Sequence, residues 1–208
     1  MSTSINQQVA HILLEKQAVI LQPDDPFTWA SGIKSPIYCD NRQLLSYPKE
    51  RRIVAEGLAD LIKTYYPEAT VIAGTATAGI PHAAWVSEVL GLPMVYVRSK
   101  AKDHGRKSQI EGKLSPNDKV VLIDDLISTG GSVLEACRPV AERATVLGVA
   151  AIFTYNLKRA ENNFKEAGQT LHVLTDLHTL LEVASRDHGL TPDQLETVKA
   201  FHHRLNEN

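Results

Sequence analysis

The 208-residue sequence predicts a single α/β domain, spanning residues 1–208, with a central and mainly parallel sheet flanked by helices. Three observations favour this class. Apolar runs of strand length recur along the chain and are typical of strands buried on both faces. Segments with apolar residues three and four positions apart lie between these runs, as in amphipathic helices. The chain is also long enough to bury a substantial core.

Strands and helices alternate through the middle of the chain. The apolar runs TVIA, MVYV, VVLI, VLGVAAIFT and LHVL predict strands at 70–73, 94–97, 120–123, 146–154 and 171–174. Helical spacing predicts helices at 48–65, 80–90, 132–143 and 158–167. Two further helices are expected outside this alternation, at 6–20 and from the start signal Thr191-Pro192-Asp193 through about 201. Because helices separate the strands, the strands are expected to run parallel.

Segment 23–42 combines two kinds of residue. It is rich in Pro, Gly, Ser and Asp, yet it carries Phe27, Trp29, Ile37 and Tyr38. Large apolar side chains are unusual in a solvated linker. We therefore expect an ordered extension that packs on the sheet.

Composition argues against several classes of protein. The chain has 22 Lys and Arg against 24 Asp and Glu, a formal net charge of −2, so a general affinity for nucleic acid or an anionic membrane has no support. The N-terminus lacks the order of a signal peptide and no apolar run approaches a membrane span, which predicts a cytoplasmic protein. Cys39 and Cys137 are too few and too far apart for a disulfide framework or a zinc site, and the eight histidines show no metal-ligand spacing.

Three segments are expected at one edge of the predicted sheet. Ligands of open parallel sheets sit beyond the carboxyl ends of the strands, where backbone N–H groups and helix N-termini converge. The segments that follow three of the predicted strands are 74–79, 98–113 and 124–132. They are the candidate ligand-binding segments.

The segment DDLISTGGS, 124–132, suits a phosphate monoester. Ser128, Thr129 and Ser132 supply hydroxyl donors, while Gly130 and Gly131 allow a tight turn and a close approach of the backbone. The phosphate would lie at the start of the following helix.

The two acids that open this segment need another partner. Asp124 and Asp125 repel a phosphate, since like charges repel. Sugar hydroxyls, or a Mg²⁺ ion bound to substrate oxygens, meet this need. The alternative is that the acids end a strand and the hydroxyls and glycines cap a helix.

A P-loop nucleotide-binding site is disfavoured. The segment GTATAG, 74–79, continues with Ile80 and Pro81 rather than with the lysine and hydroxyl residue of that motif. No GxGxxG sequence is present to indicate a dinucleotide fold. The small residues of 74–79 instead allow backbone amides to approach an anion.

Segment 98–113 carries a concentrated positive charge. It has six basic residues against two acidic ones, and its apolar residues are confined to Ala101 and Ile110. We expect a mobile surface loop rather than a core element, one that closes as a lid on a polyanion. A substrate with a phosphate, hydroxyls and a second anionic group satisfies all three segments, and phosphoribosyl pyrophosphate has these groups.

Three stretches of the sequence resemble a known family. The stretch VVLIDDLISTGGS, 120–132, resembles the signature of the type I phosphoribosyltransferases. FTWASGIKSPIYCDNR, 27–42, and RSKAKDHG, 98–105, resemble the members of that family that use orotate as the acceptor base. The resemblance implies the fold of this family, with a small N-terminal hood at about 1–45 and a basic lid loop at about 98–113.

The same resemblance implies an activity. Orotate and phosphoribosyl pyrophosphate would condense reversibly to orotidine 5'-phosphate and pyrophosphate, a step of pyrimidine (UMP) biosynthesis. Mg²⁺ would be the cofactor, held mainly through the substrate rather than by direct protein ligands. The chain would form a homodimer in which each lid reaches the neighbouring subunit's site.

Residue roles are carried over position by position. Asp124 and Asp125 would hold the ribose hydroxyls and act in catalysis, and Lys102 is the best further catalytic candidate. The residues implied to bind phosphoribosyl pyrophosphate are Arg98, Lys102, His104, Asp124, Asp125, Leu126, Ile127, Ser128, Thr129, Gly130, Gly131 and Ser132, with Ser128 also near orotate. Ala30, Ala78 and Ser99 stand where the enteric-bacterial form has lysines, so those cationic contacts are not carried over.

Other functions remain open on the sequence. A phosphoribosyltransferase for a purine or for uracil would share the phosphoribose site, because that site does not define the base. An RNA-binding pyrimidine regulator on the same fold would need a basic face beyond the lid. An inactive interaction protein is the third alternative, since a fold alone does not establish activity.

Overall fold

The computed structural model describes residues 4–28, 32–99 and 109–207. Its central sheet has six strands, in the order β10 (Leu171–Asp176), β9 (Thr145–Thr154), β8 (Lys119–Ile127), β5 (Val71–Thr75), β6 (Met94–Val97) and β7 (Ile110–Glu111). Neighbouring strands are parallel except β6 and β7, which are antiparallel. The predicted α/β class with a mainly parallel sheet is therefore confirmed.

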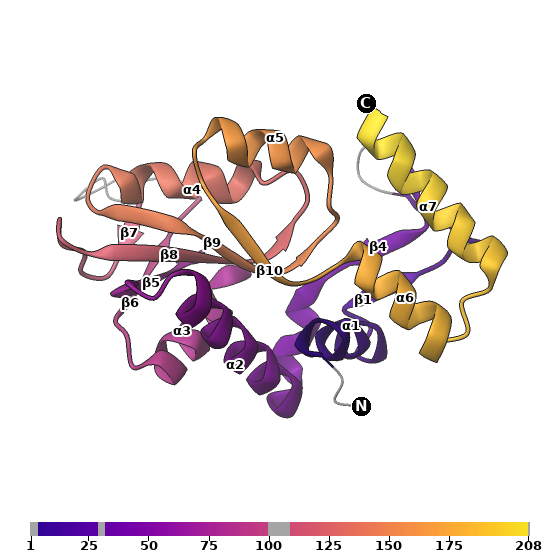
Figure 1. Cartoon of the computed structure of the whole chain (residues 1–208), viewed down its shortest axis with the longest axis horizontal. Helices are drawn as coiled ribbons and strands as arrows, with labels where there is room; N and C mark the ends of the chain where they lie inside the picture. The colour runs from indigo at the N-terminus through magenta and orange to yellow at the C-terminus, as the bar shows by residue number, and fades with distance from the viewer. Residues whose placement is uncertain (1–3, 29–31, 100–108, 208) are drawn as a thin grey trace.

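Helices cover both faces of this sheet (Figure 1). α2 (Pro48–Tyr65) and α3 (Gly79–Leu90) lie on one face, and α4 (Gly131–Ala141) and α5 (Lys158–Glu166) lie on the other. The two cores divide the residues of β8 between them: Val121 and Ile123 belong to one, and Val120 and Leu122 to the other. This alternation follows from the two-residue period of a strand, and it explains why the run VVLI is apolar throughout.

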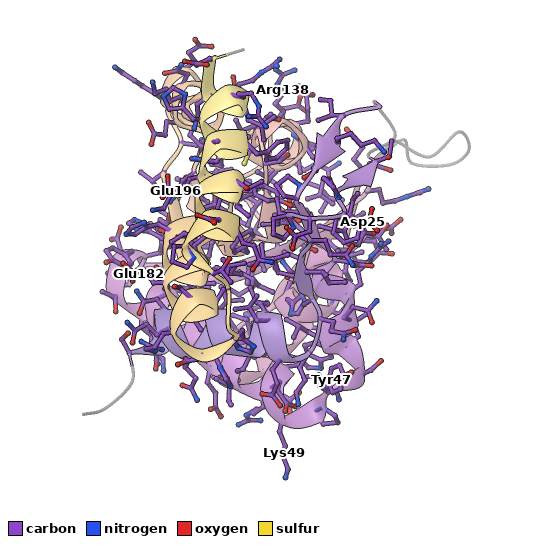
Figure 2. All side chains as sticks on the ribbon, turned by 90° about the vertical axis from the view of Figure 1, so that its right-hand side faces the viewer. Asp25, Tyr47, Lys49, Arg138, Glu182 and Glu196 are labelled. Atoms are coloured by element: carbon purple, nitrogen blue, oxygen red, sulfur yellow. The ribbon has the colours of Figure 1, made fainter. Side chains whose placement is uncertain are left out.

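The N-terminal segments and the last two helices gather at one end of the molecule. They are α1 (Ile5–Glu15), β1 (Val19–Leu21), β2 (Phe27–Thr28), β3 (Lys34–Ser35), β4 (Ile37–Cys39), the 3-10 helix η1 (Asn41–Ser46), α6 (Leu177–Asp187) and α7 (Pro192–Glu207). β1 pairs with β4, and β2 with β3, both antiparallel. Figure 2 shows α6 and α7 along this end, with the exposed side chains of Glu182 and Glu196 on their surface.

The structure corrects two expectations. The predicted helix at 6–20 is too long, because α1 ends at Glu15 and Gln17 adopts a left-handed φ of 55° that lets the chain turn into β1. The prediction that 98–113 contributes nothing to the core is wrong at Ile110, which is 5% exposed in strand β7. Residues 100–108 of that segment lie outside the described residues. α6 was not predicted.

No helix among the described residues is long and apolar enough to cross a membrane.

α7 secures the start of α5 from a distant part of the sequence. Leu157 precedes α5 and has an apolar side chain that cannot cap the helix. The Asn206 side-chain oxygen of α7 instead accepts a hydrogen bond of 2.7 Å from the Lys158 N–H. One turn earlier on α7, the His202 Nε2 atom lies 2.7 Å from the Tyr155 carbonyl oxygen. α7 therefore fixes the β9–α5 connection at two points.

We expect Asn206→Ala to lower the free energy of unfolding by about 1 kcal/mol, because the first turn of α5 loses its cap. Urea denaturation at equilibrium measures the change. Asn162→Ala, on the exposed side of α5, is the matched control and should leave stability nearly unchanged. Equal losses in the two variants would contradict this role of Asn206.

Candidate active site at the carboxyl edge of the sheet

β8 is longer than the strand beside it, and this difference creates the site. Pairing between β5 and β8 ends at Gly74 and Ile123, whereas β8 continues to Ile127 beside β9. Asp124 and Asp125 therefore lie within the strand, not after it as the sequence predicted, and beyond the last residue paired with β5. The extension carries both carboxyl groups past the edge of the neighbouring strand.

The two acids are poorly solvated. Burial raises the pKa of Asp124, the nearby Asp125 carboxylate raises it further, and the Thr75 hydroxyl opposes the rise. Burial also raises the pKa of Asp125. The Asp125 N–H donates a hydrogen bond of 2.9 Å to the Asp124 side chain. A ligand that brings hydroxyl donors or a cation would relieve the cost of ionising this pair.

The acid pair fits a metal ion held mainly by a substrate. Among the described residues, no three His, Cys, Asp or Glu side chains come together to form a metal cluster. Asp124 and Asp125 offer hard carboxylate oxygens of the kind that Mg²⁺ prefers. Mg²⁺ commonly takes one or two carboxylates and completes its shell with phosphate oxygens and water. The donor set therefore suits Mg²⁺ brought by a polyphosphate substrate.

The loop after β8 presents the N-terminus of α4. Gly130 is the N-cap residue, with a left-handed φ of 76°, and it has no side chain with which to occupy the first N–H groups of the helix. Ser128 and Ser132, on either side, are exposed. A Cβ atom at Gly130 would lie 2.6 Å from Cε2 of Phe164 on α5, so only glycine fits. This arrangement can bind a phosphate group.

A second anion-binding segment lies between β5 and α3. The Thr75 hydroxyl donates a hydrogen bond of 3.0 Å to the Ile123 carbonyl oxygen. A Cβ atom at Gly79 would collide with that same carbonyl oxygen. The start of α3 thus packs directly against β8, one residue before Asp124. The peptide bond between Ala76 and Thr77 in this segment is cis.

A cavity of about 470 Å³ joins these elements. It is lined by Thr75 at the end of β5, Ala76 after it, Arg98 after β6 and Ser132 at the start of α4, among others. The Arg98 side chain is 36% exposed, and its Nη1 lies 3.8 Å from Oε1 of Glu111. The cavity walls also carry Arg138, Glu135 and Glu142, so the cations Arg98 and Arg138 and the start of α4 offer anion-binding groups beside two acids.

The structure describes most of the predicted site residues and groups them at this edge. Arg98 follows β6, and the residues from Asp124 to Ser132 end and follow β8; these two strands flank β5 in the sheet. Ile127 is 1% exposed and belongs to the core, and its carbonyl oxygen accepts hydrogen bonds from the Tyr155 N–H and the Thr154 hydroxyl, so this residue presents no exposed group to a ligand. Lys102 and His104 lie outside the described residues.

Sequence reasoning missed Asn41. This side chain is fully buried, and its Nδ2 donates a hydrogen bond of 2.8 Å to the Asp125 carbonyl oxygen. Asn41 lies in the CDNR end of the segment that resembles the family. Nothing local distinguishes it from Asp40 or Arg42, which pair with each other on the surface. The contact joins η1 directly to the acid pair.

The β2–β4 segment presents aromatic and cationic side chains near the site. Phe27 and Tyr38 are in ring contact, with centroids 5.5 Å apart, and Tyr38 is 40% exposed. The Lys34 ammonium donates a hydrogen bond of 2.7 Å to the Thr28 hydroxyl. The exposed Tyr38 ring can stack on a planar ligand.

Comparison with known proteins gives a consistent result. Residues 40–172 match the family described as the phosphoribosyl transferase domain. The orotate phosphoribosyltransferase of Enterococcus faecalis is 62% identical over 184 residues, which cover 88% of this chain and 87% of that protein. The orotate phosphoribosyltransferase of Halalkalibacterium halodurans is 55% identical over 198 residues, 95% of this chain and 94% of that protein.

Two solved structures superpose on this chain over most of its length. The orotate phosphoribosyltransferase from Aeropyrum pernix superposes with a TM-score of 0.75 at 27% identity, covering 86% of this chain and 98% of that one. Leishmania donovani UMP synthase superposes with a TM-score of 0.80 at 29% identity, covering 96% of this chain and 42% of that one.

Because the Asp124 carboxyl is poorly solvated, its replacement by a neutral amide should raise the free energy of unfolding, by an amount that depends on pH. A carboxyl whose folded pKa is raised stabilises the fold when protonated, and this stability is lost as the pH rises through the raised pKa. Asp124→Asn should therefore be more stable than the parent protein at pH 8, by about 1 kcal/mol or more. The gain should shrink toward zero near pH 4, where the parent carboxyl is protonated in the folded protein.

Urea denaturation across this pH range measures the effect. Asp60→Asn, at a surface position on α2, is the control and should show no comparable gain. A gain for Asp124→Asn that is absent at pH 8, or that is independent of pH, would contradict the burial argument.

Proposed function

This chain belongs to the phosphoribosyltransferase family, as an orotate phosphoribosyltransferase, and we propose that its carboxyl sheet edge binds phosphoribosyl pyrophosphate in one defined direction. The observation that carries this assignment is the order within one strand, loop and helix. Two partly buried acids, Asp124 and Asp125, are followed after five residues by an uncapped helix start. The two features suit different parts of one sugar phosphate.

The 5'-phosphate is assigned to the loop from Ser128 to Ser132. The N–H groups at the start of α4 and the flanking hydroxyls supply donors, and the helix dipole favours the negative charge. The ribose hydroxyls are assigned to Asp124 and Asp125, because a hydroxyl donor satisfies a buried carboxylate without adding charge.

The pyrophosphate end is assigned to the opposite side of the cavity. Arg98 and the backbone of 74–79 supply positive charge and N–H donors there. Lys102 and His104 join this assignment on the sequence resemblance alone. When bound, Mg²⁺ would neutralise charge on the pyrophosphate as it leaves.

The reaction exchanges two bonds at the anomeric carbon of ribose. The bond from this carbon to the pyrophosphate oxygen breaks, and a bond from the orotate ring nitrogen to the same carbon forms. That nitrogen gives up its proton, which water or the departing pyrophosphate accepts. The carbon acquires oxocarbenium character, as in glycoside chemistry. The protein's part is to hold the ribose through Asp124 and Asp125, to stabilise the departing negative charge through Arg98 and Lys102, and to place orotate in line beside Ser128.

We further propose that the enzyme acts in the cytoplasm as a homodimer with Mg²⁺, each lid serving the neighbouring subunit's site. The resemblance of RSKAKDHG supports this arrangement. Mixing subunits tests it: Lys102→Ala and Asp125→Asn proteins, each inactive alone, should regain activity together, since a mixed dimer has one intact site. Absence of recovery after subunit exchange would contradict a shared lid.

We expect orotate to be consumed when phosphoribosyl pyrophosphate and Mg²⁺ are added, seen as loss of orotate absorbance. Adenine, hypoxanthine, xanthine and uracil, tested in the same buffer, should give no nucleotide at comparable rates. A faster reaction with any of these bases would overturn the assignment of orotate.

Lys102→Ala should lower kcat by about 10²- to 10³-fold, because an aligned cation is lost from the leaving group. Lys63→Ala makes the same charge change at an exposed position on α2, outside the lid, and should be nearly as active as the parent. Steady-state kinetics of both variants, with circular dichroism to confirm folding, provide the measurement. Near-normal turnover of Lys102→Ala would refute its role.

A further inference from the structure

Two neighbouring residues of α5 contact two neighbouring residues of the loop from Ser128 to Ser132, the phosphate loop. The Asn163 side-chain nitrogen donates a hydrogen bond of 2.8 Å to the Thr129 carbonyl oxygen. The Phe164 ring lies against Gly130, where an added Cβ would come within 2.6 Å of its Cε2 atom. α5 is therefore in contact with the loop on both sides of the peptide bond between Thr129 and Gly130.

We propose that Asn163 is a positioning residue for the phosphate loop, which holds this peptide with its N–H toward the bound 5'-phosphate. The proposal rests on the assignment of the 5'-phosphate to this loop. It adds a residue outside the loop, and 34 positions away from Thr129 in the chain, to the determinants of substrate binding.

The argument begins with the planarity of the peptide bond. In a trans peptide the C=O and the N–H of the next residue point in opposite directions. The bond from Asn163 draws the Thr129 oxygen toward α5. The Gly130 N–H must then point away from α5, toward the side on which the hydroxyls of the loop and the start of α4 offer donors.

The alternative orientation of this peptide would oppose phosphate binding. Gly130 has no Cβ, so its backbone dihedral angles are less restricted than those of other residues, and the peptide before it can rotate more readily. If the peptide rotated, the Thr129 carbonyl oxygen would face the phosphate and repel it. Asn163 favours the productive orientation by satisfying that oxygen on the other side.

Phe164 and Asn163 have different roles: Phe164 anchors α5 in the core, and Asn163 contacts the phosphate loop. The Phe164 side chain is 5% exposed and belongs to the core between α4, α5 and the sheet, so it anchors the helix. Ala160, one turn earlier, is 3% exposed in the same core, and Asn206 caps the helix start. These contacts hold α5 in place without Asn163, which is only half-buried. Removal of the Asn163 amide should therefore alter the loop more than the fold.

The experiment compares Asn163 with Asn162, the exposed neighbour on the same helix. Asn163→Leu removes the donor at similar size, and Asn163→Asp places a carboxylate against the Thr129 oxygen. Both should raise KM for phosphoribosyl pyrophosphate about tenfold or more, since a hydrogen bond to a charged group is lost or misdirected. KM for orotate and kcat should change by less than about twofold. Asn162→Leu and Asn162→Asp should match the parent enzyme.

The outcomes separate this proposal from a structural role and from the site assignment. Equal rises in both KM values together with a large fall in Tm would overturn it, as would an unchanged KM for phosphoribosyl pyrophosphate. Asn163→Ala, the smallest change, replaces the other variants if either fails to fold. Ser132→Ala, within the loop, tests the 5'-phosphate assignment. If Ser132→Ala raises this KM and the Asn163 variants do not, only the positioning role fails; if neither does, the assignment of the phosphate fails.

Discussion

Two carboxyl groups held side by side, largely out of water, are the constraint on which the site depends. Their position follows from the length of β8, which passes the paired end of β5 and carries Asp124 and Asp125 into the site. Both pKa values rise because the protein solvates the ionised acids poorly. A site of this kind is less stable alone than with its ligand, since ribose hydroxyls or a cation restore the missing interactions. The acid pair thus favours substrates that bring hydroxyl groups or a cation, and it lowers the stability of the protein without a ligand.

The surrounding elements keep this edge compact. Gly79 allows α3 to begin against the Ile123 carbonyl, and Gly130 allows α4 to begin against the Phe164 ring. Each glycine stands where a side chain would separate a helix start from its neighbour. Two helix starts can therefore pack closely at the same edge of the sheet as Asp124 and Asp125. The anion-binding power of the edge is a consequence of backbone packing as much as of charged side chains.

Support for the acid pair and the phosphate loop comes from residues outside the stretch 120–132. α7 caps α5 through Asn206, α5 contacts the loop through Asn163 and Phe164, and η1 reaches the Asp125 carbonyl through Asn41. The last helix of the chain, α7, is thus linked through α5 to the loop at 128–132. These residues do not bear the chemistry, but they set the direction in which backbone groups point.

Much of the fold was predictable, because its signals are local. The five predicted strands and four connecting helices are present, since apolar period and length are properties of short stretches. The errors arose where tertiary contacts decide: Gln17 ends α1 early so that β1 can pair with β4, and Ile110 joins the core because β7 pairs with β6. β8 also extends to Ile127 because β9 continues to pair with it.

The chemical groups of the site follow from a short stretch of neighbouring residues. The order of DD and STGGS along the chain specifies acids and phosphate donors in adjacent positions, whatever the rest of the fold does. Only the tertiary structure decided how strongly the acids are buried and which residues support the loop. Asn41 and Asn163 reach their partners across 84 and 34 residues of chain. Such contacts depend on how distant segments pack in three dimensions, and a pattern of neighbouring residues does not record that packing.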